Sequence, residues 1–268
     1  MEVITRSYDA ARTGANLNES ILVPRKVGSN LLFKKFSLDF VHQPGIADDP
    51  FLEAQPLYVS GLKMEDGKPH DVVYICTMAN NVWAFDANTG KPIWTKPTNL
   101  GRPIKPGPDP KNAPPATDID RWGINGLWGI LSTPVLDLDA KKMYVVCWTS
   151  SDNSVAKAVF ELHEVDLVSG KDSNKIEVQA SAPNQKVPGK DTPTLIPSRQ
   201  KQRASLLLQK LGNPPKKTVF IAFAMTHEEG DITHGWVLAY DVESFKLAAT
   251  WCTTPGGAGS GIWQAGQG

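Results

Sequence analysis

Residues 71–94 read DVVYICTMANNVWAFDANTGKPIW, and this stretch decides the fold. It holds two apolar runs, Val72–Thr77 and Val82–Asp86, that are rich in aromatic and β-branched residues. An Asn-Asn dipeptide separates them and is typical of a tight turn, because asparagine tolerates positive φ. A second turn at 88–90 leads into the short run 92–94. With an apolar run just upstream, the pattern predicts a four-stranded antiparallel meander, which is the unit of a β-propeller blade.

Residues 84–94, AFDANTGKPIW, resemble the tryptophan-docking repeat of pyrroloquinoline-quinone (PQQ) propellers. In that family the pattern Ala-x-Asp-x-x-Thr-Gly-x-x-x-Trp recurs once per blade. Asp86 and Thr89 can hydrogen-bond the backbone of the turn. Gly90 supplies positive φ, and Trp94 can cover the neighbouring blade. The resemblance implies a quinoprotein-like β-propeller, here a shortened member of the family.

Two further repeats follow along the chain. Asp166 and Asp241 stand where the first repeat has Asp86, and Gly170 matches its glycine. The docking tryptophan is missing from the second repeat, and Phe245 replaces the glycine in the third. Packing between those blades is therefore expected to use other residues. The aligned aspartates are 80 and 75 residues apart (166 − 86 and 241 − 166), which is longer than an ordinary blade of ~40–50 residues.

The extra length lies in two proline-rich stretches, 97–130 and 182–203. Proline lacks the N–H that a strand ladder needs, so both are expected to be long loops on one face of the disc, where binding surfaces are usually built. A polar lead-in segment that contains Arg12 is expected to lie across a face of the propeller. The run 31–38 is expected to form a strand that completes the last blade.

The expected fold is therefore all-β: a single β-propeller domain over residues 1–268, with four or five blades, each a four-stranded antiparallel sheet with long face loops. Its expected segments are, in chain order, a lead-in at 1–28, repeats at about 29–96, 131–180 and 204–254, and the start of a closing blade at 255–268. Either the ring is closed and small, or the chain is the front part of a longer propeller, whose open edge strands would pair with a second copy as a homodimer.

The composition excludes several kinds of partner. The chain has 268 residues, 41% of them hydrophobic, which is enough for one sizeable core. Its net charge of +0 gives no sign of a nucleic-acid partner, and no apolar run is long enough to span a bilayer. The N-terminus lacks the apolar region of a signal peptide. The resemblance implies a periplasmic or secreted protein whose signal peptide is absent from this chain; a cytoplasmic location stays open.

Residues 226–236, THEEGDITHGW, form the densest polar cluster. His227, Asp231 and His234 are candidate metal ligands, because oxygen ligands suit calcium and imidazoles suit zinc or iron. A metal there would activate a water or polarise a carbonyl, so His227, Glu228 and His234 are candidate catalytic residues of a hydrolase that acts on lactones or esters. The hypothesis is a small molecule bound at the mouth of the propeller channel, with Ca2+ as the candidate cofactor. The alternative is a solvated hairpin with a charged tip.

Two tryptophans are candidates for contact with a cofactor. They are Trp236 and Trp263, because quinone cofactors lie against an indole in the family that this repeat resembles. Those dehydrogenases also use a vicinal Cys-Cys disulfide, which this sequence lacks; its three cysteines are expected to be buried thiols. PQQ is therefore the disfavoured cofactor and PQQ-dependent dehydrogenation the least favoured activity. A non-enzymatic scaffold for protein interaction is the main alternative to the hydrolase.

Overall fold

The computed structural model describes residues 2–16, 36–38, 51–105, 126–225, 233–257 and 261–262. The strands are β1 (Leu57–Lys63), β2 (Pro69–Cys76), β3 (Asn81–Asp86), β4 (Thr98–Asn99), β5 (Val135–Asp137), β6 (Lys142–Ser150), β7 (Ala158–Asp166), β8 (Asp172–Glu177), β9 (Gln200–Lys201), β10 (Leu207–Leu211), β11 (Lys216–Met225), β12 (Trp236–Asp241) and β13 (Lys246–Cys252). Short 3-10 helices lie at η3 (Val155–Lys157), η4 (Pro183–Gln185) and η5 (Pro197–Arg199). Within these ranges no helix is long and apolar enough to cross a membrane.

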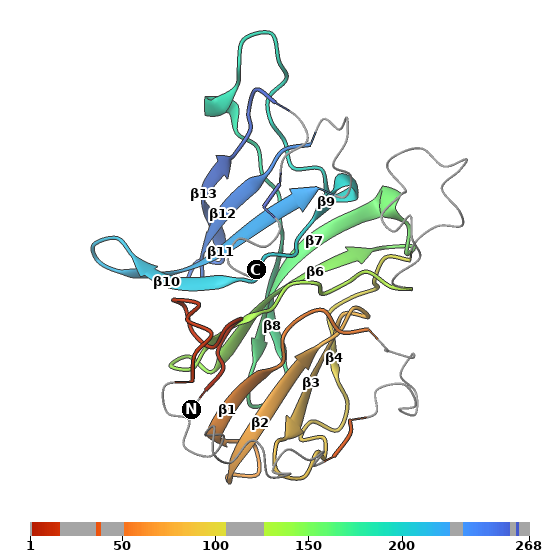
Figure 1. Ribbon diagram of the computed structural model, residues 1–268, viewed down its shortest axis with the longest axis vertical. Coiled ribbons are helices and arrows are strands. Elements are labelled where there is room, and N and C mark those ends of the chain that lie inside the picture. The colour runs from red at the N-terminus through yellow and green to blue at the C-terminus, as the bar shows by residue number, and fades with distance from the viewer. Residues whose placement is uncertain are drawn as a thin grey trace, which may run out of the picture.

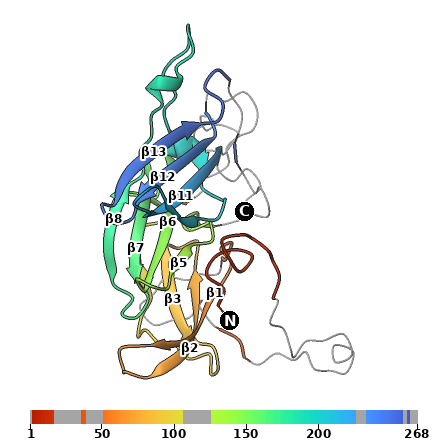
Figure 2. The same cartoon turned by 90° about the vertical axis from the view of Figure 1, so that its left-hand side faces the viewer.

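The strands build three antiparallel sheets in chain order, here called the first, second and third blade. The first has the order β1-β2-β3-β4, the second β5-β6-β7-β8 and the third β10-β11-β12-β13, with β9 paired to the end of β11. Each strand lies beside its neighbour in sequence, which is the meander that the sequence predicts. Figures 1 and 2 show the three sheets stacked one on the next. The all-β, propeller-type fold is confirmed, and the number of blades in a ring stays a prediction.

Two strands differ from the prediction. The run 92–94 does not form the fourth strand of the first blade: Pro92 makes an isolated bridge with Phe85, and β4 follows only at Thr98–Asn99. The bonds Asp86 N–H to Lys91 O and Ile93 N–H to Ala84 O flank this bridge, so the missing N–H of Pro92 costs β3 no bond, and the chain leaves the ladder only after Ile93. Of the strand predicted at 31–38, only residues 36–38 are described, and they are not in a strand.

One type of turn follows β3, β7 and β12. In each, an aspartate Oδ1 accepts hydrogen bonds from the backbone N–H and the hydroxyl of the residue three positions later. The pairs are Asp86–Thr89, Asp166–Ser169 and Asp241–Ser244, with N···O distances of 2.8, 2.9 and 2.8 Å. The next residue has positive φ in all three turns: +71° at Gly90, +73° at Gly170 and +52° at Phe245. The three aligned aspartates therefore have the same surroundings.

The indole of Trp94 joins the first blade to the second. Its Nε1 donates a hydrogen bond to the Val168 carbonyl at 3.0 Å, and a Cβ on Gly170 would lie only 2.8 Å from the indole. A glycine is therefore needed for so close an approach. Tyr74 contacts the same ring with centroids 5.7 Å apart and donates its hydroxyl to the Leu167 carbonyl at 2.6 Å. Aliphatic side chains of both sheets fill the rest of this interface.

Aromatic rings fill the interface between the second and third blades. Trp148 stacks on Phe160 with centroids 5.2 Å apart, and Phe160 meets Phe223 edge-on at 5.0 Å. Trp236 and Tyr240 of β12 belong to the same core. All five side chains are at most 1% exposed. Packing of these rings holds the two sheets together without the tryptophan-docking turn.

The N-terminal segment lies along the inner strands of the blades. A backbone bridge joins it to Tyr58 of β1, and Leu136 of β5 donates its N–H to the segment at 2.8 Å. Thr5 is fully buried and donates its hydroxyl to the Leu206 carbonyl at 3.0 Å. The Arg12 guanidinium donates to the same carbonyl at 3.0 Å. The segment thus touches all three blades, on the side opposite β8 and β13 (Figure 2).

Residues 36–38 cover the other face of the first blade. Leu38 packs against the cluster that contains Trp83 and Phe85. A Cβ on Gly90 would lie 2.7 Å from the Phe36 ring. Phe36 therefore lies on the turn of the first blade much as Trp94 lies on the turn of the second. The sequence gives no local sign of this contact.

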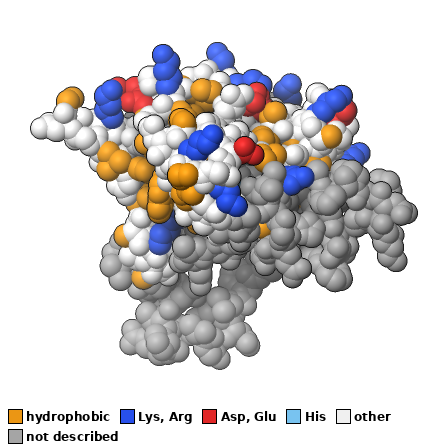
Figure 3. All heavy atoms as spheres, turned by 90° about the horizontal axis from the view of Figure 1, so that it is seen from above, with side chains coloured by type: hydrophobic (Ala, Val, Ile, Leu, Met, Phe, Trp, Pro, Cys, Tyr) orange, Lys and Arg blue, Asp and Glu red, His pale blue; other side chains and the backbone are white. Residues whose placement is uncertain are grey.

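The described surface carries mixed charge. Seen from above (Figure 3), basic side chains are scattered among apolar and acidic ones and do not gather in one field. This agrees with the net charge of +0. The largest exposed apolar side chain described is Trp251 of β13, which is 57% exposed.

Candidate functional site

The predicted metal and catalytic cluster is described only in part. His227, Glu228 and Asp231 lie outside the described residues, as does Trp263. His234 is described and lies two positions before β12. The metal and catalytic roles of this cluster stay predictions, and only the surroundings of His234 bear on them.

His234 is held by two neighbours. Its Nδ1 lies 2.7 Å from the Thr254 carbonyl oxygen, so Nδ1 carries a proton and donates it. In the neutral ring, Nε2 then has the lone pair that a metal ligand needs. Trp236 meets the imidazole edge-on, with centroids 6.4 Å apart. The Trp236 indole is itself fully buried in the core, so its contact with a cofactor stays a prediction.

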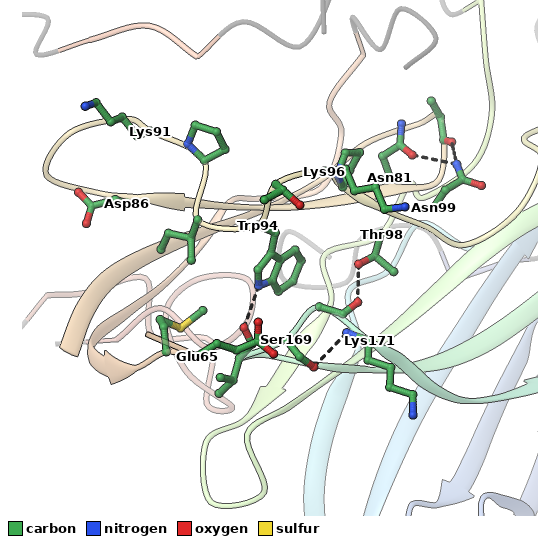
Figure 4. A pocket seen from close by; sticks show the side chains of 18 of the residues that line it. Glu65, Asn81, Asp86, Lys91, Trp94, Lys96, Thr98, Asn99, Ser169 and Lys171 are labelled. Carbon is green, nitrogen blue, oxygen red and sulfur yellow. Dashed lines mark hydrogen bonds between the residues drawn. The ribbon is translucent and has the colours of Figure 1, made fainter. Parts of the chain in front are cut away.

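A large groove of about 1520 Å³ runs between the first and second blades (Figure 4). One wall is the segment 91–99 of the first blade, and the other is the turn at 168–171 of the second. The Trp94 indole lies between the walls and points toward the second blade (Figure 4). The Thr98 hydroxyl donates to the Gly170 carbonyl and ties the walls together. The groove is thus a direct product of the tryptophan-docking turn.

Proline and aliphatic side chains give this groove an apolar surface. They are Pro92, Ile93, Pro97, Pro103 and Leu127, all exposed or half-buried. Proline rings lose little conformational entropy when a ligand covers them. The groove can therefore hold an apolar ligand body in the way that small-molecule sites usually do.

In the groove lining, His70 forms ion pairs with two carboxylates, those of Asp66 and Asp86. The His70 Nε2 lies 3.0 Å from Asp66 Oδ2, and its Nδ1 lies 3.3 Å from Asp86 Oδ2. The hydrogen bonds to Asp66 and then Asp86 raise the pKa of His70 above its ordinary value. Even with His70 protonated, the two carboxylates leave this group with a net negative charge.

Five exposed cations also line the groove: Lys91, Lys96, Arg102, Lys105 and Lys171. None has a carboxylate within ion-pair distance among the residues that the structure describes. Arg102 donates one N–H to the Ser151 carbonyl at 2.9 Å, which fixes part of its side chain. This part of the groove is therefore suited to an anionic group.

A second group of chemically active side chains lies inside the second blade. Cys147 of β6 is paired opposite Glu161 of β7, and His163 follows two residues later on the same face. The Cys147 sulfur, a Glu161 oxygen and a His163 ring nitrogen all lie within 4.8 Å of one another. Cys147 is 0% and His163 1% exposed. The His163 Nε2 has no hydrogen-bond partner among the described residues.

Charged groups surround His163. Its Nδ1 lies 3.0 Å from Asp172 Oδ2, and its Nε2 lies 3.5 Å from Glu161 Oε2, whose other oxygen is held by Lys175 at 2.8 Å. Burial lowers the pKa of His163, but Asp172, the Cys147 thiol and Glu161 outweigh it and raise that pKa to about 11. His163 chiefly lowers the pKa of Glu161 to about 2, and burial raises the pKa of Cys147. The two carboxylates therefore stabilise the protonated form of His163.

A smaller cavity of about 520 Å³ opens beside this group. Glu161 and His163 line it together with Thr149. Asn99 and Arg102 line both this cavity and the groove. The buried group and the groove are therefore neighbours along the interface of the first two blades.

Comparisons with known proteins found little. No protein family and no curated protein matches the sequence. Among solved structures, a quinohemoprotein alcohol dehydrogenase from Comamonas testosteroni resembles it at a TM-score of 0.44 and 13% identity, over 81% of this chain and 32% of that one. The quinohemoprotein alcohol dehydrogenase ADHIIG from Pseudomonas putida HK5 resembles it at a TM-score of 0.41 and 11% identity, over 78% of this chain and 31% of that one. A europium-containing methanol dehydrogenase has a TM-score of 0.37 and 12% identity, over 78% of this chain and 35% of that one.

This chain spans about a third of the length of those structures. Scores this low carry no argument about activity or cofactor. The propeller character of the chain rests on its own three meander sheets and on the repeated aspartate turn.

The sequence contains part of the signal for the Cys147 group. Glu161 and His163 are two residues apart, so they lie on one face of the strand predicted there. The position of Cys147 opposite Glu161 depends on the register of β6 and β7. The long connection at 151–157 carries no motif that fixes this register. The pairing therefore becomes visible only in the structure.

Proposed function

We propose that this propeller binds a small organic anion in the groove between its first and second blades. The observation that supports it most is an apolar lining beside the cations Lys96, Arg102 and Lys105. Small-molecule sites usually measure ~300–1,000 Å³, and the groove is larger at about 1520 Å³. A carboxylate or phosphate would lie near the cations, with the apolar body along Pro92 and Ile93. The ligand site would thus lie by β4, not at the channel mouth that the sequence favours.

The test is a binding screen on the whole chain. Carboxylates and phosphate esters with apolar bodies would be compared with their neutral amides and alcohols, by thermal shift and then calorimetry. We expect anions to bind better than their neutral partners, because charge-assisted hydrogen bonds contribute about 1.5–3 kcal/mol each. Arg102→Ala should weaken anion binding roughly tenfold or more.

Lys246→Ala is the matched control, since Lys246 is exposed on β13 and does not line the groove. Equal binding of anions and neutral partners, or equal affinity in Arg102→Ala and Lys246→Ala, would contradict the proposal. A screen without any hit would favour a protein-binding scaffold, which a pull-down from envelope extracts would then test.

Metal-assisted hydrolysis of a lactone or ester is the second candidate function. It is supported by the hydrogen bond from His234 Nδ1 to Thr254, which leaves Nε2 available as a ligand. His227 and Asp231 would complete the metal site, and Glu228 would act as base. Metal analysis, with hydrolysis measured before and after EDTA, tests this. Loss of metal and activity in His234→Gln is expected; an EDTA-insensitive protein without bound metal would remove the candidate.

The described residues give PQQ no support, and Trp263, the other candidate for contact with it, lies outside them. The cysteines at 76, 147 and 252 are buried thiols in three different strands, as predicted. The candidate indole of Trp236 has no exposed face on which a quinone could lie. No step of either proposed function therefore passes through PQQ.

A further inference from the structure

We propose that Cys147, Glu161 and His163 bind a Zn²⁺ ion, with a fourth coordination position open to the adjoining cavity. The proposal concerns the interior of the second blade and does not depend on a ligand in the groove. It also does not involve His234. Ligand chemistry, distances, neighbouring groups and access to solvent each bear on it.

The three donors are the kinds that zinc takes. Thiolate, imidazole and carboxylate are its common protein ligands, and a thiolate among them disfavours calcium or magnesium. In tetrahedral zinc sites with bonds of about 2.0–2.3 Å, ligand atoms lie roughly 3.3–3.8 Å apart. Nε2 of His163 and Oε2 of Glu161 are already 3.5 Å apart. The Cys147 sulfur lies within 4.8 Å of the other two donors, so it would move inward by about 1 Å at most.

The groups around these donors match the support that metal ligands usually have. Asp172 accepts a hydrogen bond from Nδ1 of His163 at 3.0 Å, which turns Nε2 toward the site. Lys175 holds Oε1 of Glu161 at 2.8 Å and leaves Oε2 facing His163. Both ligands are therefore oriented before any ion binds. Orientation of this kind is not needed for a side chain that only fills space.

The second independent observation is the state of His163 Nε2. The side chain is 1% exposed, and this nitrogen has no hydrogen-bond partner among the described residues. Its charged neighbour is Glu161 Oε2 at 3.5 Å, which is too long for a good hydrogen bond, and a buried polar atom without one costs about 1–3 kcal/mol. A Zn²⁺ bound at Nε2 would displace its proton to solvent and remove this cost. The nitrogen faces Cys147 and Glu161, so the same ion would satisfy all three groups.

The competing interpretation is that Cys147 is a nucleophile. His163 could then act as its base and Asp172 could orient the imidazole, as in a catalytic triad. The thiol is 0% exposed, and burial raises its pKa. It also lies 3.6 Å from the Leu100 carbonyl, which closes its outer side. A substrate carbonyl could not reach such a sulfur, whereas an ion can. The geometry therefore favours a metal site.

The cavity provides both access and a free coordination position. Glu161 and His163 lie in its lining, with Thr149, Arg102 and Lys175 around them. Three protein ligands and one open position characterise zinc sites that bind water or substrate, whereas structural sites use four protein ligands. The fourth ligand would be a water, or an anionic group held near Arg102 and Lys175.

The experiment measures metal binding by the whole chain. Protein stripped of metal would be titrated with Zn²⁺, and with Co²⁺ as a coloured substitute whose thiolate bond gives a near-ultraviolet charge-transfer band. We expect one Zn²⁺ per chain at this site and a thiolate–cobalt band in the wild type. Cys147→Ala and His163→Gln should lose the band. Asp172→Asn should weaken Zn²⁺ binding roughly 10- to 100-fold.

Two variants serve as controls. Cys76→Ala removes another buried cysteine, whose sulfur contacts the Met143 sulfur at 3.8 Å in the same interface, and should keep the band. His234→Gln should keep it as well, which separates this site from the predicted one near β12. A wild type without the band, a band that survives Cys147→Ala, or unchanged Zn²⁺ affinity in Asp172→Asn would overturn the proposal. The wild-type and Asp172→Asn results decide it even where a core variant fails to fold.

Discussion

The two interfaces between blades join the same kind of sheet with different chemistry. Between the first and second blades, Trp94 reaches across from a turn and rests on Gly170. Between the second and third, rings such as Trp148 and Phe223 meet in the middle of the sheets. At the position of Trp94 the second blade has Asn174, which is exposed. One interface is held at its rim by a local motif, and the other at its centre by residues far apart in sequence.

The difference shows what the aspartate turn does and does not determine. The turn is the same in all three blades, and it persists where its glycine is replaced by Phe245. Docking of the next blade onto that turn is a separate property, which needs both an indole and a glycine. A large aromatic core can replace docking, because it buries more apolar area than one indole does. The groove lies beside the docked interface.

The largest effect is expected in the aromatic interface. Phe160→Ala should destabilise the protein by about 3–5 kcal/mol, because Phe160 is fully buried and contacts rings of both blades. Urea unfolding measures this. Trp251→Ala, at a 57% exposed aromatic of the third blade, should cost less than about 0.5 kcal/mol. Equal losses in the two variants would mean that the aromatic core does not join the blades.

The next effect is expected in the docked interface. Trp94→Ala should cost about 3 kcal/mol, since the indole is almost buried and donates one hydrogen bond. Gly170→Ala should cost about 1–3 kcal/mol in the wild type, because its Cβ would clash with Trp94 and its φ is +73°. In the Trp94→Ala background it should cost only about 1 kcal/mol. A double-mutant cycle in urea measures the coupling, and additive effects would contradict docking.

A smaller effect should appear at Phe245, where a phenylalanine adopts φ of +52°. Replacing its buried ring destabilises the protein in either case, but Phe245→Gly should be about 1 kcal/mol more stable than Phe245→Ala. At Phe223, in the middle of β11, the order should be reversed: Phe223→Gly should be less stable than Phe223→Ala by about 0.5–1 kcal/mol. Thermal unfolding of the four variants decides the point. The same order at both positions would show that the turn does not favour glycine.

The smallest effect concerns acid. Burial raises the pKa of Asp166, but hydrogen bonds from Ser169 and Val168 outweigh it and hold that pKa below its ordinary value of 3.8. A depressed pKa contributes stability above the ordinary value, and this is lost as pH falls through the lower, folded-state value. Asp166→Asn should therefore flatten the fall of the urea midpoint between pH 5 and pH 2. In the control variant Asp139→Asn, whose native side chain is 80% exposed, the urea midpoint should fall with pH as it does in the wild type.

Much of the fold follows from local sequence. β3 begins one residue before its predicted start and β2 three residues before, and both end within one residue of the prediction, because apolar runs and turn residues mark them. The predicted position of the fourth strand of the first blade was wrong: the run 92–94 makes only one bridge to β3 at Pro92, and the strand forms at Thr98–Asn99. Phe36 on Gly90 was not predictable, because that contact joins segments more than 50 residues apart with no shared motif.

The candidate sites follow from sequence less well. Trp94 was predicted to cover the next blade, but nothing in the sequence indicates that a groove forms along it. Cys147 was interpreted as a simple buried thiol, and its burial is confirmed. Its nearness to His163 depends on strand register, which is a property of the whole hairpin. The cluster at 226–236 was easy to notice because its polar residues are adjacent, and adjacency is no evidence of a shared site.

Some residues of the N-terminal segment bind residues that are translated much later. Thr5 and Arg12 bind carbonyls at Ser205 and Leu206, about 200 positions later. At ~5–20 residues per second, translation of that interval takes roughly 10–40 seconds. During this time the segment can bond to β1 and β5 but lacks its hydrogen bonds to the third blade. The rate of translation therefore limits how soon the three blades can be joined. A nascent chain that stalls before residue 206 lacks the bonds to Leu206, and the edge of β1 could then pair with another nascent chain on the same messenger RNA.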